Sequence, residues 1–496
     1  MKTRALAALI GWMVGMLLMA CGMARAQDAL PPSVLDALRA AGLPADALAA
    51  VALPLQHWDW AWSHQARKPM QPGSTMKLVT SMVALDQLGP NHRGFTELRS
   101  AATLQDGTLQ GDLVLRGGAE VELGAPQLWA LLGDLRAAGV QHIAGDLLVD
   151  RERFRPARTD LGLPPFDEWP EFPYNVIPDA LLLAGAMLSL DLRASDSAVQ
   201  AHSVPPMASI DIVSRQTLVD ARCADWSEHW KPARVMSEGG RTRIELQGGF
   251  PRGCQQRVSL QLIDRQDLTE KLFRSLWEGL GGSWAGRARE AVGAEPSQLL
   301  ARRVGRPWGE LLRHLNKTSD NAWTRQLFLE LGVPAMAAQP ERSTRDLADA
   351  AVRQWLSEQG IDDQGLVLDN GSGLSRSERI SPLQLAQMLK VAWSGRHAAD
   401  LQMSLPTVGE DGTMRNRLKD SPAMGWARLK TGTLRNVVAL AGYLKDGQGR
   451  PWAVAMMINH EQARRGRAVL DALVDQMVRQ GPHAPVYGTG PQGWGP

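Results

Sequence analysis

The chain has 496 residues, 44% of them hydrophobic, and its 54 basic and 52 acidic residues leave a formal net charge of +2. This length predicts a globular protein of two to four domains at roughly 100–200 residues each. The chain has no long basic run with interleaved aromatic residues, which argues against a nucleic-acid-binding protein. The balanced charge indicates no particular partner.

The first residues have the pattern of a secretory signal peptide. Two basic residues precede an apolar stretch over residues 5–20, and Ala24 and Ala26 stand at the usual cleavage spacing. We expect residues 1–26 to be removed on export to the periplasm. Two alternatives stay open. One is a retained anchor, although the stretch is shorter than the ~20 residues that span a bilayer; the other is a lipoprotein signal with Cys21 as the lipidated residue.

Outside this leader the chain has two cysteines, Cys223 and Cys254. In an oxidising compartment they would form one disulfide that closes a loop of about thirty residues, and two buried free thiols are the alternative. The ten histidines do not stand with Cys, Asp or Glu at metal-ligand spacing, and no further apolar run approaches the length of a membrane span. We therefore expect no metal, no other cofactor and no transmembrane segment in the mature chain.

The elements predicted first along the chain are a helix, a β-hairpin and a second helix. Helical spacing of apolar residues marks Pro32–Leu43, and strand-like runs at Ala49–Leu55 and Trp58–Trp62 form the hairpin. Gln71-Pro72-Gly73 then breaks the chain, and an apolar-rich segment continues over Ser74–Leu88. This segment is predicted to be a buried helix with Ser74 at its start.

Between about residues 95 and 290 short alternating runs separated by Gly, Pro and Asp predict a mostly β region. The predicted strands are Gly111–Leu115, Asp146–Val149, Ala208–Val213, Arg243–Leu246 and Val258–Ile263. One helix is expected at Gln127–Ala138, and the Pro-rich segment 163–178 is expected to be irregular.

Helical patterns dominate from Trp308 onward. The predicted helices are Trp308–Leu315, Ser319–Leu331, Asp346–Gln359 and, after strands at Ala427–Leu429, Val437–Leu444 and Trp452–Ile458, Arg464–Arg479. The two ends of the chain thus have an α/β pattern, with a β region inserted between them. We expect one discontinuous domain over 27–94 and 290–481, an inserted region of two subdomains over 95–289, and a mobile tail over 482–496.

The first of three short motifs is Ser74-Thr75-Met76-Lys77. Positions three apart share one face of a helix, so the Lys77 amine can reach the Ser74 hydroxyl. A lysine held neutral by burial or by a nearby cation could then remove the hydroxyl proton and make Ser74 a nucleophile. Taken alone, the same letters would more often mean a capped helix with a surface lysine.

The other two motifs are Ser319-Asp320-Asn321 and Lys430-Thr431-Gly432-Thr433. In the second motif a serine could pass a proton and an amide could donate to a substrate carbonyl, although a helix cap would use the same residues. In the third, an amine and a hydroxyl on a strand could hold a carboxylate, and a glycine would let substrate approach closely. An ordinary strand end is the alternative reading of the third motif.

Together and in this order, the motifs resemble the signature of class A β-lactamases and penicillin-binding proteins. The long gap between Lys77 and Ser319 requires an insertion, and a large insertion there resembles the penicillin-binding protein 4 family, peptidase family S13. Other stretches match this family: Leu115–Gly118, Ala138–Val140, Ile143–Asp146, Asn370–Arg376, Leu405–Thr413, Lys430–Leu434 and Ala441–Tyr443. The resemblance implies a serine β-lactamase and penicillin-binding-protein-like catalytic domain of α/β (α+β) class with a mostly-β insertion.

The resemblance also implies an activity: hydrolysis of D-Ala-D-Ala peptide bonds in peptidoglycan by a D-alanyl-D-alanine carboxypeptidase, endopeptidase or both. Ser74 would be acylated with Lys77 as its base, Ser319 would relay protons near Lys430, and Asn321 would hold the substrate amide. β-Lactams, which mimic D-Ala-D-Ala, would form a slowly hydrolysed ester at Ser74.

The same resemblance implies the residues that bind substrate. Thr431 with Lys430 would hold the terminal carboxylate, and Gly432 would let the substrate backbone approach closely. The backbone N–H groups of Ser74 and Thr433 would meet the oxyanion. Arg376 matches a family position near the substrate side chain, and a surface salt bridge is the alternative.

The chain departs from the family pattern at three places outside the catalytic positions. Ala119-Glu120-Val121 stands where Asp-Pro is usual, Thr324-Arg325 where a glutamate is common, and Asn370 where aspartate is usual. We expect these changes to affect the insertion loops and substrate preference rather than acylation.

Two other functions compete. A β-lactamase would need a Glu-x-x-Leu-Asn loop between the first two motifs, which is not found there. A non-catalytic penicillin sensor or peptidoglycan-binding protein would usually carry a membrane span joined to a signalling domain. The motifs do not distinguish trimming of free peptide ends from cutting of cross-links, and they do not predict the oligomeric state or the role of the insertion.

Overall fold

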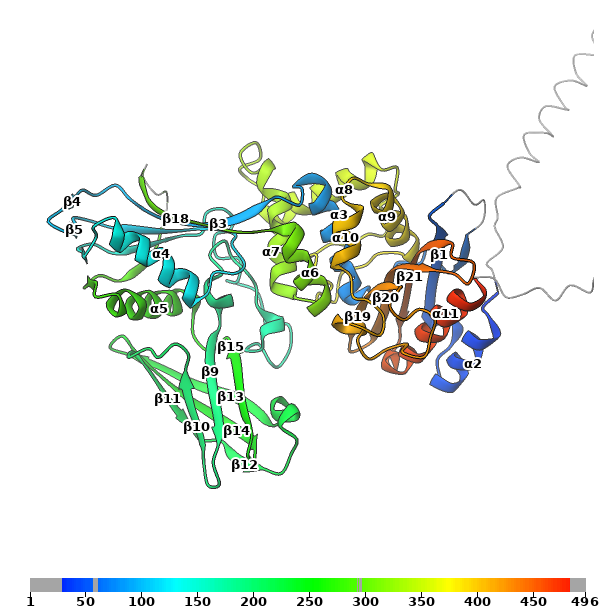
Figure 1. Ribbon diagram of the computed structural model, residues 1–496, viewed down its shortest axis with the longest axis horizontal. Coiled ribbons are helices and arrows are strands. Elements are labelled where there is room, and N and C mark those ends of the chain that lie inside the picture. The colour runs from blue at the N-terminus through cyan, green and yellow to red at the C-terminus, as the bar shows by residue number, and fades with distance from the viewer. Residues whose placement is uncertain (1–28, 57–60, 292, 294–296, 482–496) are drawn as a thin grey trace, which may run out of the picture.

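The computed structural model describes residues 29–56, 61–291, 293 and 297–481. The predicted leader, with Cys21, and the predicted tail over 482–496 lie outside these residues. Within them, no helix combines the length and the apolar character that crossing a membrane requires. Figure 1 shows three bodies: a main body formed by both ends of the chain, and two inserted bodies.

The main body is built on an antiparallel sheet whose strands are β1 (Leu48–Pro54), β2 (Trp62–His64), β19 (Arg428–Leu434), β20 (Val437–Lys445) and β21 (Pro451–Asn459). Their spatial order is β19-β20-β21-β1-β2. One face is covered by α2 (Pro32–Ala41) and α11 (Arg467–Gln480). Against the other face lie α3 (Lys77–Gln87), α6 (Trp308–Thr318), α7 (Asn321–Gly332), α8 (Thr344–Glu358), α9 (Pro382–Ser394) and α10 (Ala398–Ser404).

Strand β20 shows why this sheet is buried on both faces. Val438 and Leu440 belong to the core that includes α2 and α11, whereas Ala439, Ala441 and Tyr443 belong to the core that includes α3 and α6 to α9. Because successive side chains of a strand point to opposite faces, a strand between two helical layers needs a nearly continuous apolar run.

The chain leaves the main body along β3 (Arg93–Ser100) and returns along β18 (Gln298–Pro307), which pair antiparallel. The first inserted body adds α4 (Ala125–Ala137), α5 (Arg265–Gly279), β4 (Leu104–Gln105), β5 (Thr108–Leu109), β6 (Leu113–Gly118), β7 (His142–Ile143), β8 (Leu147–Asp150), β16 (Ser283–Trp284) and β17 (Ala288–Glu290). Its two sheets have the orders β17-β8-β6-β3-β18 and β16-β7-β5-β4.

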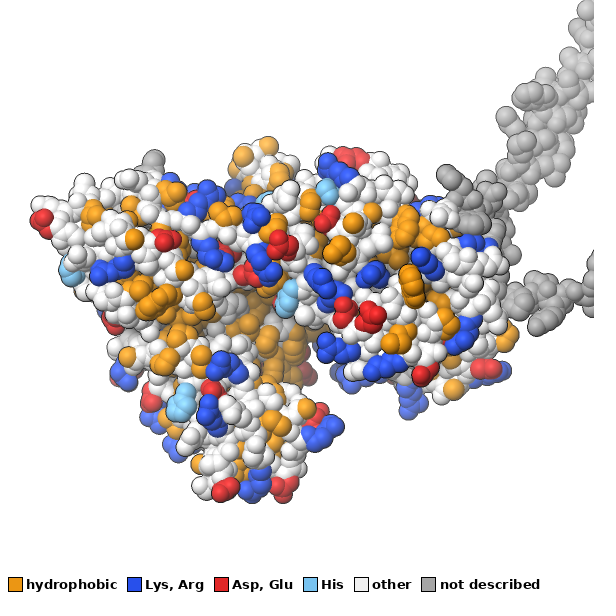
Figure 2. Space-filling view, viewed as in Figure 1, with side chains coloured by type: hydrophobic (Ala, Val, Ile, Leu, Met, Phe, Trp, Pro, Cys, Tyr) orange, Lys and Arg blue, Asp and Glu red, His pale blue; other side chains and the backbone are white. Residues whose placement is uncertain are grey.

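The second inserted body contains two further sheets. Its strands are β9 (Leu188–Ala194), β10 (Val199–Ser203), β11 (Ile210–Ser214), β12 (Thr217–Val219), β13 (Trp230–Glu238), β14 (Arg241–Pro251) and β15 (Gln255–Leu260). One sheet has the order β10-β9-β15, and in the other β14 pairs with β11, β12 and β13. Both inserted bodies share one hydrophobic core. On the face shown in Figure 2, basic and acidic side chains are interspersed, as the balanced composition suggests.

Most of the predicted elements are present within a few residues of their predicted bounds. Two differ near the first motif. The second hairpin strand, predicted at Trp58–Trp62, falls mostly on residues outside the described ones, and β2 occupies Trp62–His64. The segment predicted as a helix from Ser74 begins instead as a 3-10 turn, Gly73–Met76, and is α-helical only from Lys77.

Sequence analysis did not predict α5, α9 or α10. The signal for α5 was present, because Leu268, Leu272 and Leu276 recur every four positions and are buried. Asp264 caps this helix by accepting a hydrogen bond from the Gln266 N–H. Charged residues between the leucines, and the strands on either side, concealed the pattern.

Cys223 and Cys254 form the predicted disulfide, with their Cα atoms 5.4 Å apart. The bond joins the 3-10 turn Cys223–His229 to the turn that precedes β15, within the second inserted body. The alternative of two free thiols is therefore wrong.

Reduction of this disulfide should destabilise the inserted bodies, because the open chain gains conformational freedom in a segment with a sequence separation of 31. We expect a loss of about 3 kcal/mol, measured by calorimetry as a thermal transition that shifts downward in reductant. The Cys223→Ser/Cys254→Ser double variant is the control, since its transition should not respond to reductant. An unchanged transition in the reduced wild-type protein would contradict a stabilising role.

Candidate active site

The three motifs converge on one site in the main body, from the start of α3, the junction of α6 and α7, and the edge strand β19. Ser74 lies in the 3-10 turn Gly73–Met76 and is half-buried. Lys77, the first residue of α3, is completely buried. One turn of helix separates the two residues, so the Lys77 Nζ lies 3.1 Å from the Ser74 Oγ.

The Lys77 amine has two further partners, both of them oxygen acceptors. Its Nζ donates to the Oδ1 of Asn321 at 2.6 Å and to the backbone carbonyl of Ser372 at 2.6 Å. The Asn321 amide is oriented by its other end, because Nδ2 donates to the Tyr174 carbonyl at 3.0 Å. The amine is therefore held between the first motif, the second motif and a loop before α9.

The second motif joins two helices at a sharp turn. Ser319 ends α6 with a φ of 65°, in the left-handed region that non-glycine residues rarely occupy. Asp320 then caps α7 by accepting from the Trp323 N–H at 2.9 Å. The capping interpretation of this motif is thus correct for Asp320, while its two neighbours turn toward the lysines.

The third motif places a second buried lysine beside Ser319. Lys430 on β19 is completely buried, and its Nζ donates to the Ser319 Oγ at 2.9 Å. Thr431 Oγ1 lies 2.8 Å from Thr413 Oγ1, and Thr433 is exposed. At Gly432 a Cβ would lie 2.5 Å from the Pro72 carbonyl and 3.1 Å from the Ser74 nitrogen, so glycine is required for β19 to approach the turn before the serine.

Burial changes the protonation of both lysines. Removal from water lowers the pKa of Lys77 well below its ordinary value, and the positive charge of Lys430 lowers it further. Burial also lowers the pKa of Lys430 to about 7. A neutral amine beside Ser74 is therefore accessible at a lower pH than for an ordinary lysine, as the first motif required.

Arg376 was predicted to bind substrate. Within the described residues, it makes no hydrogen bond to a residue of the three motifs. It is exposed, and its guanidinium lies 5.0 Å from the centre of the Phe166 ring in the segment 163–178. Its part in substrate binding stays a prediction. Among the described residues, no group of three or more His, Cys, Asp and Glu side chains is arranged to hold a metal ion.

The three departures from the family pattern have structural partners here. Glu120 is buried and accepts from Thr96 Oγ1 and Arg303 Nε. Arg325 is buried under the segment 163–178 and donates to the Val176 carbonyl at 2.9 Å. Asn370 accepts from the N–H and the hydroxyl of Ser372, which keeps that turn closed.

Sequence reasoning assigned no role to Ser372, Thr413 or Tyr174, which all contact motif residues. Ser372 and Thr413 lie in stretches that match the family, Asn370–Arg376 and Leu405–Thr413, and this match was the available signal. Tyr174 contributes a backbone carbonyl. Any residue at this position would have the same backbone carbonyl, so the sequence carried no signal for the contact.

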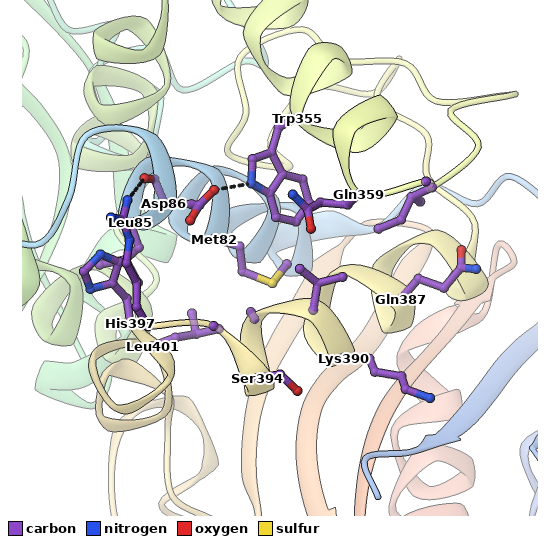
Figure 3. A pocket seen from close by; sticks show the side chains of 16 residues that line it. Met82, Leu85, Asp86, Trp355, Gln359, Gln387, Lys390, Ser394, His397 and Leu401 are labelled. Carbon is purple, nitrogen blue, oxygen red and sulfur yellow. Dashed lines mark hydrogen bonds between the residues drawn. The ribbon is translucent and has the colours of Figure 1, made fainter. Parts of the chain in front are cut away.

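A pocket of about 530 Å³ opens at the opposite end of α3, between α8, α9 and α10 (Figure 3). Its lining includes Met82, Leu85, Trp355, Lys390 and His397. The Asp86 carboxylate accepts from the Trp355 indole at 2.9 Å, which ties these helices together. None of the described residues that line this pocket belongs to the three motifs, so the pocket is separate from the site at Ser74.

Comparisons with known proteins agree with the convergence of these motifs. The D-alanyl-D-alanine carboxypeptidase of Actinomadura sp. (strain R39) is 28% identical over 440 residues, which cover 85% of this chain and 79% of that protein. The D-alanyl-D-alanine carboxypeptidase DacB of Haemophilus influenzae is 25% identical over 402 residues, 79% of this chain and 80% of that protein.

The crystal structure of penicillin binding protein 4 from Haemophilus influenzae has the same fold, with a TM-score of 0.74 at 23% identity over 90% of this chain and 99% of that one. This confirms the predicted penicillin-binding-protein-like fold class. The model of the D-Ala-D-Ala carboxypeptidase 3 (S13) family matches residues 33–479. The chain therefore belongs to the S13 family of D-Ala-D-Ala carboxypeptidases, which the motifs and the insertion had indicated.

Proposed function

We propose that this protein hydrolyses D-Ala-D-Ala peptide bonds of peptidoglycan through an acyl-enzyme at Ser74. The observation that carries the proposal is the placement of one buried amine, Lys77 Nζ, 3.1 Å from the Ser74 Oγ and 2.6 Å from two oxygens. Family membership supports the substrate class.

The partners of Lys77 favour proton transfer from Ser74 in one direction. A neutral amine has two N–H groups and one lone pair, and the Asn321 Oδ1 and the Ser372 carbonyl can only accept. Donation to both of these oxygens leaves the lone pair for the Ser74 O–H. Lys77 can then take the hydroxyl proton as Ser74 Oγ bonds to the carbonyl carbon of the substrate.

The departing amine must receive a proton, and the second motif is placed to supply it. Ser319 Oγ is hydrogen-bonded to Lys430 Nζ, so a proton can pass from the lysine through the serine to the leaving nitrogen. Lys430 and Thr431 on the same strand would bind the terminal carboxylate, a charge-assisted contact.

Two backbone N–H groups would stabilise the negative charge on the substrate oxygen. A Cβ on Gly432 would lie 3.1 Å from the Ser74 nitrogen, and one on Gly73 would lie 3.2 Å from the Thr433 nitrogen. These distances bring both N–H groups to the same narrow gap between β19 and the turn at Ser74. One donor of this kind contributes roughly 3–4 kcal/mol to the transition state.

The carboxylates near Lys77 favour a peptidase over a β-lactamase. Glu378 and Asp320 both act electrostatically on the amine. Oε1 and Oε2 of Glu378 accept backbone N–H groups within the loop before α9, and Asp320 caps α7. Both oxygens of Glu378 are occupied, so this carboxylate is not free to activate a water for rapid deacylation. We therefore expect a β-lactam to remain attached to Ser74 as an inhibitor.

An exported enzyme would share a compartment with its proposed substrate. The leader predicted over residues 1–26 and the Cys223–Cys254 disulfide both support a periplasmic location, since structural disulfides form in oxidising compartments. We propose the periplasm as the site of action, and anchoring at Cys21 is the alternative.

Benzylpenicillin should form one covalent adduct with the mature chain, seen by mass spectrometry on the peptide that contains Ser74. Ser74→Ala should remove the adduct because the Lys77 amine is hydrogen-bonded to no other hydroxyl among the described residues. Thr431→Ala, which keeps the nucleophile, should still become labelled. Labelling that persists in Ser74→Ala would overturn the proposed nucleophile.

The rate of acylation should be low in acid and should rise as Lys77 loses its proton. Because burial lowers the pKa of Lys77 well below its ordinary value, the rise should be complete before the usual lysine range near 10.5. Stopped-flow or quenched-flow acylation as a function of pH tests this. Lys77→Arg, which stays charged, should acylate about 10²- to 10⁴-fold more slowly; a wild-type rate in that variant would exclude Lys77 as the base.

Purified mature protein should release free D-Ala from pentapeptide muropeptides, and Ser74→Ala should not. Chromatography of cross-linked dimers digested in parallel then shows whether the enzyme also cuts cross-links. A wild-type protein that binds benzylpenicillin but processes neither substrate would favour a sensor over an enzyme.

A further inference from the structure

A buried acid lies near the pair formed by Ser74 and Lys77. Glu378, in the loop before α9, is fully buried. Its Oε1 accepts the backbone N–H groups of Asp369, Asn370 and Gly371 at 3.2, 3.0 and 2.7 Å, and its Oε2 accepts that of Gly373 at 2.7 Å. The turn 369–373 is thus wrapped around one carboxylate.

This turn meets the catalytic residues at two points. The Ser372 carbonyl accepts from Lys77 Nζ at 2.6 Å. At Gly373 a Cβ would lie 1.8 Å from the Gly73 carbonyl and 2.9 Å from the Ser74 nitrogen. The backbone of the 369–373 turn is therefore in direct contact with the 3-10 turn that carries Ser74. A shift of the turn would therefore displace both the base and the serine.

Helix α3 holds the same turn from the other side. Thr80 Oγ1 donates to the Gly371 carbonyl at 2.8 Å, and both residues are buried. Thr80 follows Lys77 by three positions, so it lies on the same side of α3 as the lysine. The turn is clamped between this hydroxyl and the Glu378 carboxylate.

We propose that Glu378 is a positioning residue of the acylation reaction, which aims the Ser372 carbonyl at the Lys77 amine and supplies a negative charge behind it. This inference rests on the proposed function of Ser74 and Lys77. Glu378 does not touch the reacting atoms and acts only through the 369–373 turn and through its charge.

Glu378 is one of four charged groups that shift the pKa of Lys77. Lys430 and Arg325 lower the pKa of the Lys77 amine, whereas Glu378 and Asp320 raise it.

Burial raises the pKa of Glu378, and the nearby Asp369 carboxylate adds to this rise. The backbone N–H groups of Asp369, Asn370 and Gly371 oppose it, because they can bond only to acceptor oxygens and so favour the ionised carboxylate. Loss of this negative charge should lower the pKa of Lys77.

Two substitutions at Glu378 separate position from charge. Glu378→Gln removes the charge and replaces one acceptor oxygen by an NH2 group that faces a backbone N–H. We expect the maximal rate of acylation by benzylpenicillin to fall about 10- to 100-fold, and the acid limb of its pH profile to move to lower pH. Glu378→Asp keeps the charge but shortens the reach, so its rate should fall while the acid limb stays at the wild-type pH.

Thr80→Val and Glu341→Gln complete the set. Thr80→Val removes the other clamp on the turn and leaves all charges in place, so the rate should fall and the acid limb should not move. Glu341 is exposed on the same body, and Glu341→Gln should keep the wild-type rate and pH profile. Rates are expressed per folded molecule, with the folded fraction measured by calorimetry.

A wild-type rate and pH profile per folded molecule in Glu378→Gln would overturn the inference, as would a rate loss with an unmoved acid limb, which a structural role alone would produce. If Glu378→Gln does not fold, wild-type rates in both Glu378→Asp and Thr80→Val would overturn it. In all these cases the wild-type protein would still be labelled at Ser74. Failure of that labelling would instead count against the proposed function.

Discussion

The site depends on one constraint: a lysine amine enclosed in the protein interior must be neutral or fully satisfied by acceptors. Lys77 meets this constraint with three oxygens, each from a different part of the main body: the turn before α3, the start of α7 and the 369–373 turn. Two of these oxygens can only accept, which leaves the Ser74 hydroxyl as the group that can give a proton to the amine. The enclosure of the lysine thus lowers its pKa and also selects its proton donor.

The rest of the fold brings these three parts together. The sheet of the main body is buried between two helical layers, and its edge strand β19 lies against the turn at Ser74, where Gly432 allows contact without a side chain.

The inserted region also reaches the site. The Tyr174 carbonyl orients the Asn321 amide, and Arg325 holds the Val176 carbonyl nearby. Residues of the insertion therefore stabilise the start of α7, although they contribute no group to the proposed chemistry.

The sequence predicted well which groups meet at the candidate site, because each belongs to a short motif with a fixed local geometry. Ser74 and Lys77 lie one helical turn apart, and the apolar run of β20 could form only a strand buried on both faces. Helix α5 was missed because charged residues concealed its leucine repeat.

Contacts made by the backbone were harder to predict. The Ser372 and Tyr174 carbonyls would be present with any residue at those positions, so only the folded chain reveals their roles. Glu378 was missed for a related reason: its four partners are backbone N–H groups, which leave no pattern in the side chains. Arg376 was chosen by family resemblance, and its position over Phe166 shows a contact with the insertion that the resemblance did not specify.

A crystal structure of the benzylpenicillin adduct is the most direct measurement of the central claim that Lys77 serves Ser74 within this enclosure. We expect an ester on Ser74 Oγ, with its carbonyl oxygen accepting from the N–H groups of Ser74 and Thr433. Lys77 Nζ should remain within hydrogen-bonding distance of the ester oxygen, of Asn321 and of the Ser372 carbonyl. An adduct on another residue, or a Lys77 side chain turned away from Ser74, would contradict it.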